Sequence, residues 1–252
     1  MPRRLGQHFL GSESVLNRIA AAVCPDREPL IIEIGPGKGA LTEKLLERAA
    51  RVVAIELDRA LVEHLRTRFD TPRLEVVHAD ILGVDLGQWA GAPIAGNLPY
   101  YITSPILEKA VRANAPRAVF LMQKEVALRL TAKPGTRDYG YLTVQTAVFA
   151  KARVLFDVKP GAFHPPPKVD SAVVLLEPRM DVVENREAFL KFLGRCFRQK
   201  RKTLRNNLVE FYSPEQIASL PEAGMRAEQL SLEQLLSVCI RVDTDAHGIK
   251  PD

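Results

Sequence analysis

The chain has 252 residues, of which 46% are hydrophobic and 26% are charged, and its net charge is +5. This is the composition of a folded globular protein, and the length suits a domain of about 150–200 residues with a smaller one attached. No apolar run is long enough to span a membrane, and the charged start of the sequence lacks the apolar segment of a signal peptide, so we expect a cytoplasmic protein. Cys24, Cys196 and Cys239 are far apart and form no C-x-x-C pair, which favours buried thiols over disulfides or a metal site.

Strand and helix patterns alternate through the first two thirds of the chain. After a helix over 15–23, the apolar strand 30–34 runs into the glycine-rich loop 35–39 and a helix over 40–46, which is how a nucleotide-binding sheet begins. The pattern then repeats in strands 51–55 and 74–77, a strand ending at Asn97, strand 118–122, and helices over 61–69 and near 106–111. This alternation predicts a parallel, doubly wound sheet. A helix over 141–150 and a pair of strands, 154–158 and 172–176, would complete it.

After Pro178 the sequence contains only helix patterns. Apolar residues recur at helical spacing from Phe189 to Phe197, and Ser213 and Ser231 have the surroundings of helix N-caps. We therefore expect a Rossmann-like α/β domain at residues 1–180 and a small all-α domain at residues 181–252.

The positive charge is concentrated in one stretch. Residues 186–205 contain eight Lys or Arg and one acid, whereas residues 206–252 contain three basic and eight acidic residues. A solvated helix face would explain an ordinary charge run, but this concentration favours a basic patch for a polyanion such as RNA.

The glycine loop bears on the choice of cofactor. Gly35, Gly37 and Ala40 satisfy the dinucleotide fingerprint, which by itself is weak evidence. The additional Gly39 and the preceding Glu33 point away from NAD and toward S-adenosylmethionine (SAM). SAM has no pyrophosphate for a helix N-terminus to hold, and its cationic groups call for nearby carboxylates.

Two acids close the strands that follow the glycine loop. Glu56 is placed to accept from a ribose diol of either cofactor, and Asp80 is placed to accept from an adenine amine. Either acid could instead be an ordinary strand-end residue, but the occurrence of both favours a cofactor site.

The stretch Asn97-Leu98-Pro99-Tyr100 suits the handling of an adenine. The Asn97 amide oxygen and the Leu98 carbonyl can each accept one hydrogen of the exocyclic amine. Pro99 stiffens the turn, and Tyr100 offers a face on which the base can stack. On these four residues alone, a strand-to-helix turn without further function explains the pattern equally well.

Five segments together carry a family resemblance: residues 6–10, 33–39, 97–100, 163–171 and 197–208. With them the chain resembles the small-subunit ribosomal RNA adenine dimethyltransferases, the KsgA/RsmA group and its eukaryotic counterparts. The resemblance implies SAM-dependent N6,N6-dimethylation of two adjacent adenosines in a hairpin loop near the 3′ end of 16S rRNA. It also implies action during small-subunit assembly, by a monomer, without a metal.

The resemblance also implies site residues. Cofactor contacts would come from His8, Leu10, Gly35, Gly37, Glu56, Asp80 and Asn97. Many family members have Asn in place of His8, so the resemblance implies a backbone contact there. The adenine would be held by Asn97, Leu98, Tyr100 and Phe163. Because three prolines follow Phe163 closely, we expect that ring on a stiff extended loop and not in a core. RNA would contact Arg198, Lys200, Arg201, Lys202 and Arg205.

Three alternatives differ from this activity. An NAD-dependent oxidoreductase leaves the basic patch and residues 97–100 unexplained. A methyltransferase fold used only as an assembly factor would not need an intact glycine loop. The large-subunit adenine methyltransferases that confer macrolide resistance are related, but Gly-Pro-Gly in the loop, Leu98 and residues 199–207 favour the small-subunit group.

Overall fold

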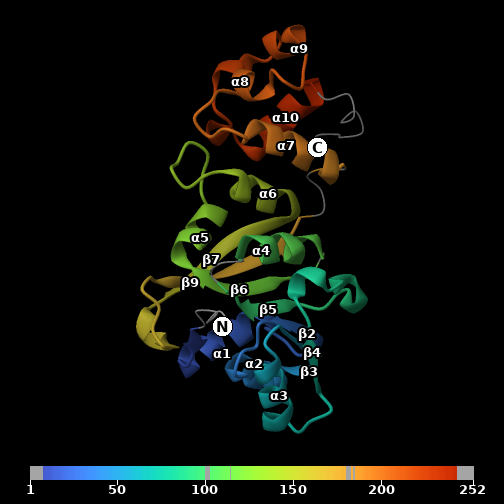
Figure 1. Cartoon of the computed structure of the whole chain (residues 1–252), viewed down its shortest axis with the longest axis vertical. Coiled ribbons are helices and arrows are strands. Elements are labelled where there is room, and N and C mark those ends of the chain that lie inside the picture. Colours follow the sequence, from blue (N-terminus) through green and yellow to red (C-terminus); the bar gives the residue numbers. More distant parts are fainter. Residues whose placement is uncertain (1–7, 100–102, 114, 180–182, 184, 243–252) are drawn as a thin grey trace. The chain divides into compact units, whose positions relative to one another are not determined.

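The structure is a computed structural model that describes residues 8–99, 103–113, 115–179, 183 and 185–242 (Figure 1). The chain divides into two compact units. One contains the residues up to Ala127 together with Ala152–Pro178, and the other contains Leu128–Lys151 together with the residues from Arg179 onward. The predicted boundary at residue 180 would assign residues 128–151 to the first domain, whereas here they belong to the second unit.

A seven-stranded sheet forms the centre of the first unit. The strand order is β4-β3-β2-β5-β6-β9-β7. The strands are β2 (Glu28–Ile34), β3 (Ala49–Glu56), β4 (Leu74–His78), β5 (Ile94–Asn97), β6 (Ala118–Gln123), β7 (Ala150–Val158) and β9 (Ser171–Pro178). The pairs among β2 to β6 are parallel, as the sequence predicts. The sequence analysis gave no orientation for the closing strands, and of these β9 is antiparallel to β6.

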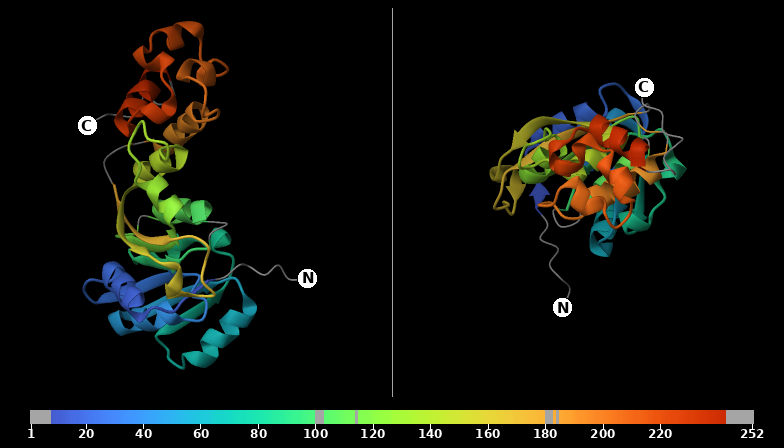
Figure 2. Two further views of the ribbon diagram at one scale, coloured as in Figure 1. Left: turned by 90° about the vertical axis from the view of Figure 1, so that its left-hand side faces the viewer. Right: turned by 90° about the horizontal axis from the view of Figure 1, so that it is seen from above.

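Helices α1 (Glu13–Val23) and α2 (Ala40–Arg48) pack against one face of the sheet. They lie next to each other, in blue, in Figure 2. The buried residues Leu16, Ile19, Ala20 and Val23 recur at helical spacing and pack in one cluster with Ile31 of β2. The remaining helices of this unit are α3 (Arg59–Arg68), α4 (Thr103–Arg112), and the 3-10 helices η1 (Ile81–Gly83), η2 (Leu86–Trp89) and η3 (Pro160–Ala162). Helix α5 (Lys124–Leu130) begins in this unit and ends in the other.

A two-stranded ribbon stands apart from the main sheet. β1 (Phe9–Leu10) pairs antiparallel with β8 (Phe163–His164), and Leu10 lies opposite Phe163. The sequence analysis did not predict this ribbon, because its strands are two residues long and far apart in the chain.

The second unit is helical, and from Arg179 onward its described residues form only helices and turns, as predicted. Its elements are α6 (Tyr141–Phe149), α7 (Arg186–Cys196), α8 (Leu204–Leu208), α9 (Pro214–Ala218), α10 (Leu232–Val242), and the 3-10 helices η4 (Pro221–Gly224) and η5 (Ala227–Gln229). Helix α6 belongs here because it packs on α7 and α10, and the ring of Tyr141 meets Phe197 edge to face at 6.2 Å. Such contacts between distant segments are not visible in the local pattern of residues 141–150.

All three cysteines are buried and none is in a disulfide within the described residues, which confirms the expectation of buried thiols. Across the described ranges, no helix combines the length and the apolar character that crossing a bilayer requires.

Candidate active site

The candidate site lies where the strand order of the sheet reverses. β2 has β3 on one side and β5 on the other, and Ile34 of β2 is level with Ile55 and Gly96 of these neighbours. Gly35, Glu56 and Asn97 therefore leave the sheet at the same edge. Crevices at the carboxyl ends of strands, at such a reversal, are the usual ligand sites of open α/β sheets.

Gly96 allows the two central strands to approach closely. A Cβ atom at this position would lie 2.6 Å from the Ile34 carbonyl oxygen. Any larger residue would push β5 away from β2 and displace Asn97, so Gly96 is part of the site although the sequence analysis passed over it.

A cavity of about 330 Å³ opens at this edge, a volume typical of small-molecule sites. Its lining includes seven of the predicted residues: His8, Leu10, Gly35, Gly37, Glu56, Asn97 and Leu98. Of the residues outside the predicted set that also line the cavity, three have ionisable side chains: Glu33, Lys38 and His164. Asp80 is not in the lining. It is exposed, and its carboxylate accepts a 2.9 Å hydrogen bond from the Leu82 N–H at the start of η1.

The Glu56 carboxylate is held by backbone N–H groups. Its Oε1 accepts from Leu57 and Asp58 at 2.9 and 3.0 Å, and its Oε2 accepts from Gly37 at 3.1 Å. A carboxylate offers about four acceptor positions, so capacity remains for a hydroxyl donor in the cavity. Glu56 thus fixes the glycine loop and at the same time presents a negative charge to the cavity.

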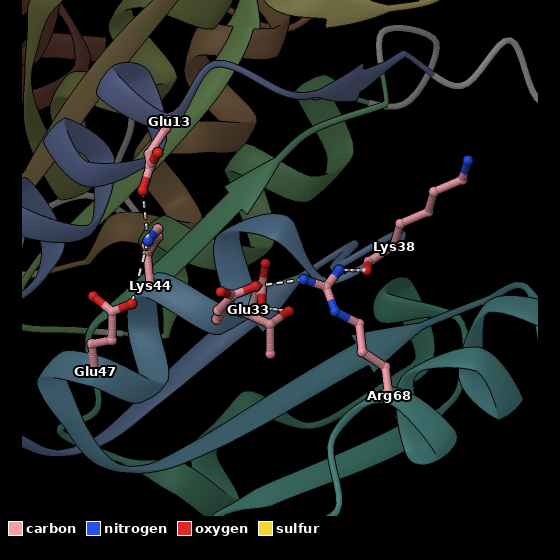
Figure 3. Close-up of polar contacts among 8 residues, drawn as sticks. Glu13, Glu33, Lys38, Lys44, Glu47 and Arg68 are labelled. Atoms are coloured by element: carbon pink, nitrogen blue, oxygen red, sulfur yellow. Dashed lines mark hydrogen bonds and ion pairs between the residues drawn. The ribbon is translucent and has the colours of Figure 1, made fainter.

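The glycine loop is further fixed from α3, as Figure 3 shows. Arg68 donates to the Lys38 carbonyl at 2.6 Å and also pairs with Glu43 of α2. Gly35, Gly37 and Gly39 all have positive φ values of 67°, 59° and 83°, a conformation that other residues adopt at a cost. The ammonium of Lys38 lies 4.7 Å from the centre of the Phe9 ring, at the rim of the cavity.

Glu33 is the most deeply buried charged group of the site, with a side chain 1% exposed. Thr42 donates to its Oε2 at 2.6 Å (Figure 3), and among the described residues no hydrogen bond reaches its Oε1. Burial raises the pKa of Glu33 to about 8; the hydrogen bond from Thr42 opposes the rise, and the charge of Glu56 adds to it. The site therefore contains a buried carboxyl group that receives one hydrogen bond from the described residues and lines a ligand-sized cavity.

Asn97 has a fixed amide orientation. Its Nδ2 donates to the His8 carbonyl at 3.1 Å. Because a carbonyl can only accept, this bond assigns the nitrogen and leaves Oδ1 as the acceptor of the amide. Among the described residues no donor reaches Oδ1. The structure thus provides the acceptor that the sequence analysis assigned to Asn97.

The residues after Asn97 anchor the turn. Leu98 is 1% exposed, and its N–H donates to the Leu121 carbonyl at 2.9 Å. The hydroxyl of Thr103, at the start of α4, donates to the Pro99 carbonyl at 2.9 Å. Tyr100, for which we predicted base stacking, lies outside the described residues.

We predicted that the ring of Phe163 would lie outside the core, but in the structure it is part of the core. It is 1% exposed and belongs to the same cluster as Leu10, Leu16 and Ile19. The expectation that its ring lies outside the core is wrong, because pairing with β1 draws the residue inward despite the prolines that follow. Its neighbour His164 lines the cavity instead, and the stacking role of Phe163 stays a prediction.

The donors and acceptors of the cavity suit SAM. Glu56 supplies negative charge for a ligand that carries an ammonium and a sulfonium, and it can accept from ribose hydroxyls. Leu16, Ile19 and Leu41 supply apolar wall. Burial raises the pKa of Glu33, so the free protein keeps its proton near neutral pH, and a cationic ligand beside it would favour its ionised form.

In the second unit, a basic loop (residues 197–203) joins α7 to α8. The predicted RNA-binding residues Arg198, Lys200, Arg201, Lys202 and Arg205 are all exposed. Arg198 pairs with Glu210, and Lys200 donates to the Arg137 carbonyl at 3.2 Å. No carboxylate of the described residues forms an ion pair with Arg201, Lys202 or Arg205.

Asn207, which the sequence analysis did not single out, holds the basic loop in shape. It is 3% exposed. Its Nδ2 donates to the carbonyls of Cys196, Gln199 and Lys202 at 2.9, 3.2 and 3.4 Å, and its Oδ1 accepts from the Gln199 N–H at 3.1 Å. A buried amide surrounded by a polar loop leaves little signal in the sequence, because a surface Asn in a helix has the same local pattern.

The fold and the cavity define a SAM-dependent methyltransferase, and comparison with known proteins specifies the kind. The chain belongs to the ribosomal RNA adenine dimethylase family, whose model matches residues 2–244. It is 45% identical to the ribosomal RNA small subunit methyltransferase A of Acidobacterium capsulatum, over 93% of this chain and 89% of the relative. The corresponding protein of Chlorobium luteolum is 42% identical over 92% and 86%.

Two solved structures are similar over almost the whole chain. A dimethyladenosine transferase from Plasmodium falciparum superposes with a TM-score of 0.79 at 26% identity, covering 96% of this chain and 99% of that one. The 23S rRNA methyltransferase ErmE superposes with a TM-score of 0.71 at 28% identity, covering 94% and 100%. These findings confirm the family resemblance and the α/β methyltransferase fold. The protein is an rRNA adenine N6,N6-dimethyltransferase that uses SAM.

Proposed function

We propose that this enzyme dimethylates two adjacent adenosines in a hairpin loop near the 3′ end of 16S rRNA. It acts in the cytoplasm as a monomer, on an immature small ribosomal subunit. The names of its relatives at 42–45% identity support the choice of the small subunit. The observation that carries the proposal is the fixed Asn97 amide, whose acceptor oxygen stands at the edge of the SAM cavity.

The residues of the cavity act mainly by positioning. SAM supplies an activated methyl group, so the protein needs neither a metal nor a strong base. Glu56 accepts from the ribose hydroxyls, Glu33 faces the cationic end of the ligand, and the backbone at His8, Leu10 and Gly35 shapes the rest. The Asp80 carboxylate accepts a hydrogen bond from the adenine amine of the cofactor once its hydrogen bond from the Leu82 N–H is broken.

The target adenine is held by neutral acceptors. Asn97 Oδ1 and the Leu98 carbonyl accept the two hydrogens of its amine and so localise the lone pair toward the methyl group. Tyr100 and Phe163 stack on the base, and for Phe163 this requires its ring to leave the core. A neutral amide suits the second methylation as well, since it binds an uncharged amine without burying a net charge.

The test is methyl transfer from labelled SAM to undermodified small subunits and to large subunits, side by side. We expect incorporation into 16S rRNA alone, with dimethyladenosine as the product in nuclease digests. Small subunits that already carry the modification serve as the control and should accept no label. Transfer to large subunits alone would overturn the assignment and favour the activity of the ErmE-like relatives.

A further inference from the structure

The second unit exposes an aromatic ring beside its basic loop. Phe211 is 42% exposed, and among the described residues it is the one phenylalanine that counts as an exposed large hydrophobic residue. Its backbone is held in a turn after α8, because the N–H groups of Phe211 and Tyr212 both donate to the Leu208 carbonyl, at 2.9 and 3.2 Å. The ring is therefore presented by an ordered turn.

Two arginines lie close to this ring, Arg195 in the last turn of α7 and Arg198 in the basic loop. The guanidinium carbons of Arg195 and Arg198 lie 5.1 and 5.9 Å from the centre of Phe211. Arg195 also lies 5.3 Å from the centre of the Tyr212 ring and donates to the Tyr212 hydroxyl at 2.5 Å. Contacts with two successive aromatic residues keep Arg195 in place. We call Phe211, Arg195 and Arg198 the aromatic platform.

In many proteins an arginine stacked on an aromatic ring has no role beyond covering that ring at the surface. Here the cover is incomplete, since two-fifths of Phe211 stays exposed with both arginines present. The surrounding charge also favours a polyanion over an apolar protein partner, because Arg205 lies on the helix that leads to Phe211 and Lys202 lies on the basic loop. Glu210 pairs with Arg198 and reduces the net charge of the platform itself. The platform is thus better suited to a base than to a phosphate.

We propose that the aromatic platform stacks one unpaired nucleobase of the rRNA, while Arg201, Lys202 and Arg205 contact the neighbouring phosphates. The inference rests on the proposed RNA-binding role of this unit and adds to it a contact of a different kind. Stacking on an aromatic face tolerates any base and depends little on salt, whereas phosphate contacts weaken steeply as salt rises.

The different salt dependence of stacking and of phosphate contacts provides the experiment. Binding of the full-length protein to undermodified small subunits is measured across a salt series for Phe211→Ala. We expect the affinity to fall about 5- to 20-fold at every salt concentration, with an unchanged slope of log Kd against log salt, as for the loss of one stacked base. Phe211→Tyr should bind as the parent does, and Phe211→Leu should be as weak as Phe211→Ala. Val209→Ala is the matched control, because Val209 is 57% exposed nearby and should change affinity less than twofold.

The outcomes separate the platform from the RNA-binding role on which it rests. Parent-like affinity of Phe211→Ala, or full affinity of Phe211→Leu, would overturn stacking. If Lys202→Glu with Arg205→Glu still flattens the salt slope in that case, RNA binding by this unit stands without the platform. If the double reversal also leaves the slope unaltered, both proposals fail. Unchanged helical content and thermal unfolding of each variant, measured by circular dichroism, would show that the second unit is folded.

Discussion

The cavity at the sheet edge and the basic loop of the second unit are ordered in different ways. In the cavity, position follows from strand register: Gly35, Glu56 and Asn97 meet because three parallel strands end at the same level. In the basic loop no sheet sets the geometry, and one buried amide, that of Asn207, holds the backbone through four hydrogen bonds. The cavity thus depends on many shared backbone contacts, whereas the basic loop, for which we propose RNA binding, depends on a few individual side chains.

The largest expected effect comes from Asn97→Ala. Loss of the acceptor should slow the chemical step about 100-fold, as for one lost hydrogen bond to a reacting group. The second methylation should suffer more than the first, because a monomethylated amine has a single hydrogen by which it can be held. Single-turnover reactions on undermodified subunits, with mono- and dimethyladenosine resolved by mass spectrometry, measure both steps. Equal slowing would refute the one-hydrogen argument, and no slowing would make Asn97 a turn residue. SAM affinity must be measured for the same variant, because Asn97 holds the His8 backbone and His8 lines the SAM cavity.

The next effect concerns Glu56. We expect Glu56→Ala to weaken SAM binding by about 1–3 kcal/mol through the loss of charge-assisted hydrogen bonds. Glu56→Gln should lose less, since its remaining oxygen can still accept. Calorimetric titration with SAM gives the affinities, and Glu63→Ala on the exposed side of α3 is the control. An unaltered affinity in folded Glu56→Ala would exclude the ribose contact.

In the second unit, Asn207→Ala should disorder the basic loop. We expect rRNA affinity to fall about tenfold and the unit to lose about 1–3 kcal/mol of stability, because the buried carbonyls lose their donor. SAM affinity should not change. The neighbouring Asn206 is exposed, so Asn206→Ala is a closely matched control. If Asn207→Ala binds rRNA normally, the shape of the loop does not matter and only its charge does.

The smallest effect is a pH dependence set by Glu33. The pKa of Glu33 is about 8 in the folded protein, above its ordinary value of 4.5. Between pH 4.5 and about 8, the folded protein without SAM therefore keeps the carboxyl proton of Glu33. The sign for stability follows: the free protein becomes less stable as pH rises from about 5 to 8, because only the unfolded chain has released the proton. A ligand ammonium facing Glu33 favours its charged form. SAM affinity should therefore rise a few-fold from pH 6 to 7.5, below the titration of the ligand's own amino group at about 7.7–8.0.

Calorimetry in buffers of different ionisation enthalpy should detect a proton released on SAM binding. Glu56 and Lys38 face the same cavity, so the dependence must be assigned with Glu33→Gln, which should abolish it. Proton release that persists in Glu33→Gln would assign the effect to another group.

Strand register also explains which features of the structure could be predicted from the sequence. Glu56 and Asn97 close apolar strands that follow a glycine loop, and parallel strands bring such ends together, so their convergence was predictable. Phe163 was not, because its burial depends on Leu10, which is far away in the chain. Asn207 was missed for a related reason: its hydrogen bonds run to a loop whose shape no local pattern specifies. Helix α6 has a clear helical pattern, but the pattern does not tell which unit the helix packs against.

The ribbon of β1 and β8 has a consequence for the order in which the enzyme matures. The His8 carbonyl fixes the Asn97 amide, while His8 itself contacts the Pro165 carbonyl through Nδ1 at 2.7 Å, and Leu10 pairs with Phe163. A nascent chain that has emerged only as far as β6 already contains the glycine loop, Glu56 and Asn97, yet it lacks the segment that secures residues 8–10. Such a chain also lacks His164 of the cavity lining, so in it neither the cavity nor the orientation of the Asn97 amide is complete. Both therefore depend on residues 163–165, which follow the glycine loop by more than a hundred residues.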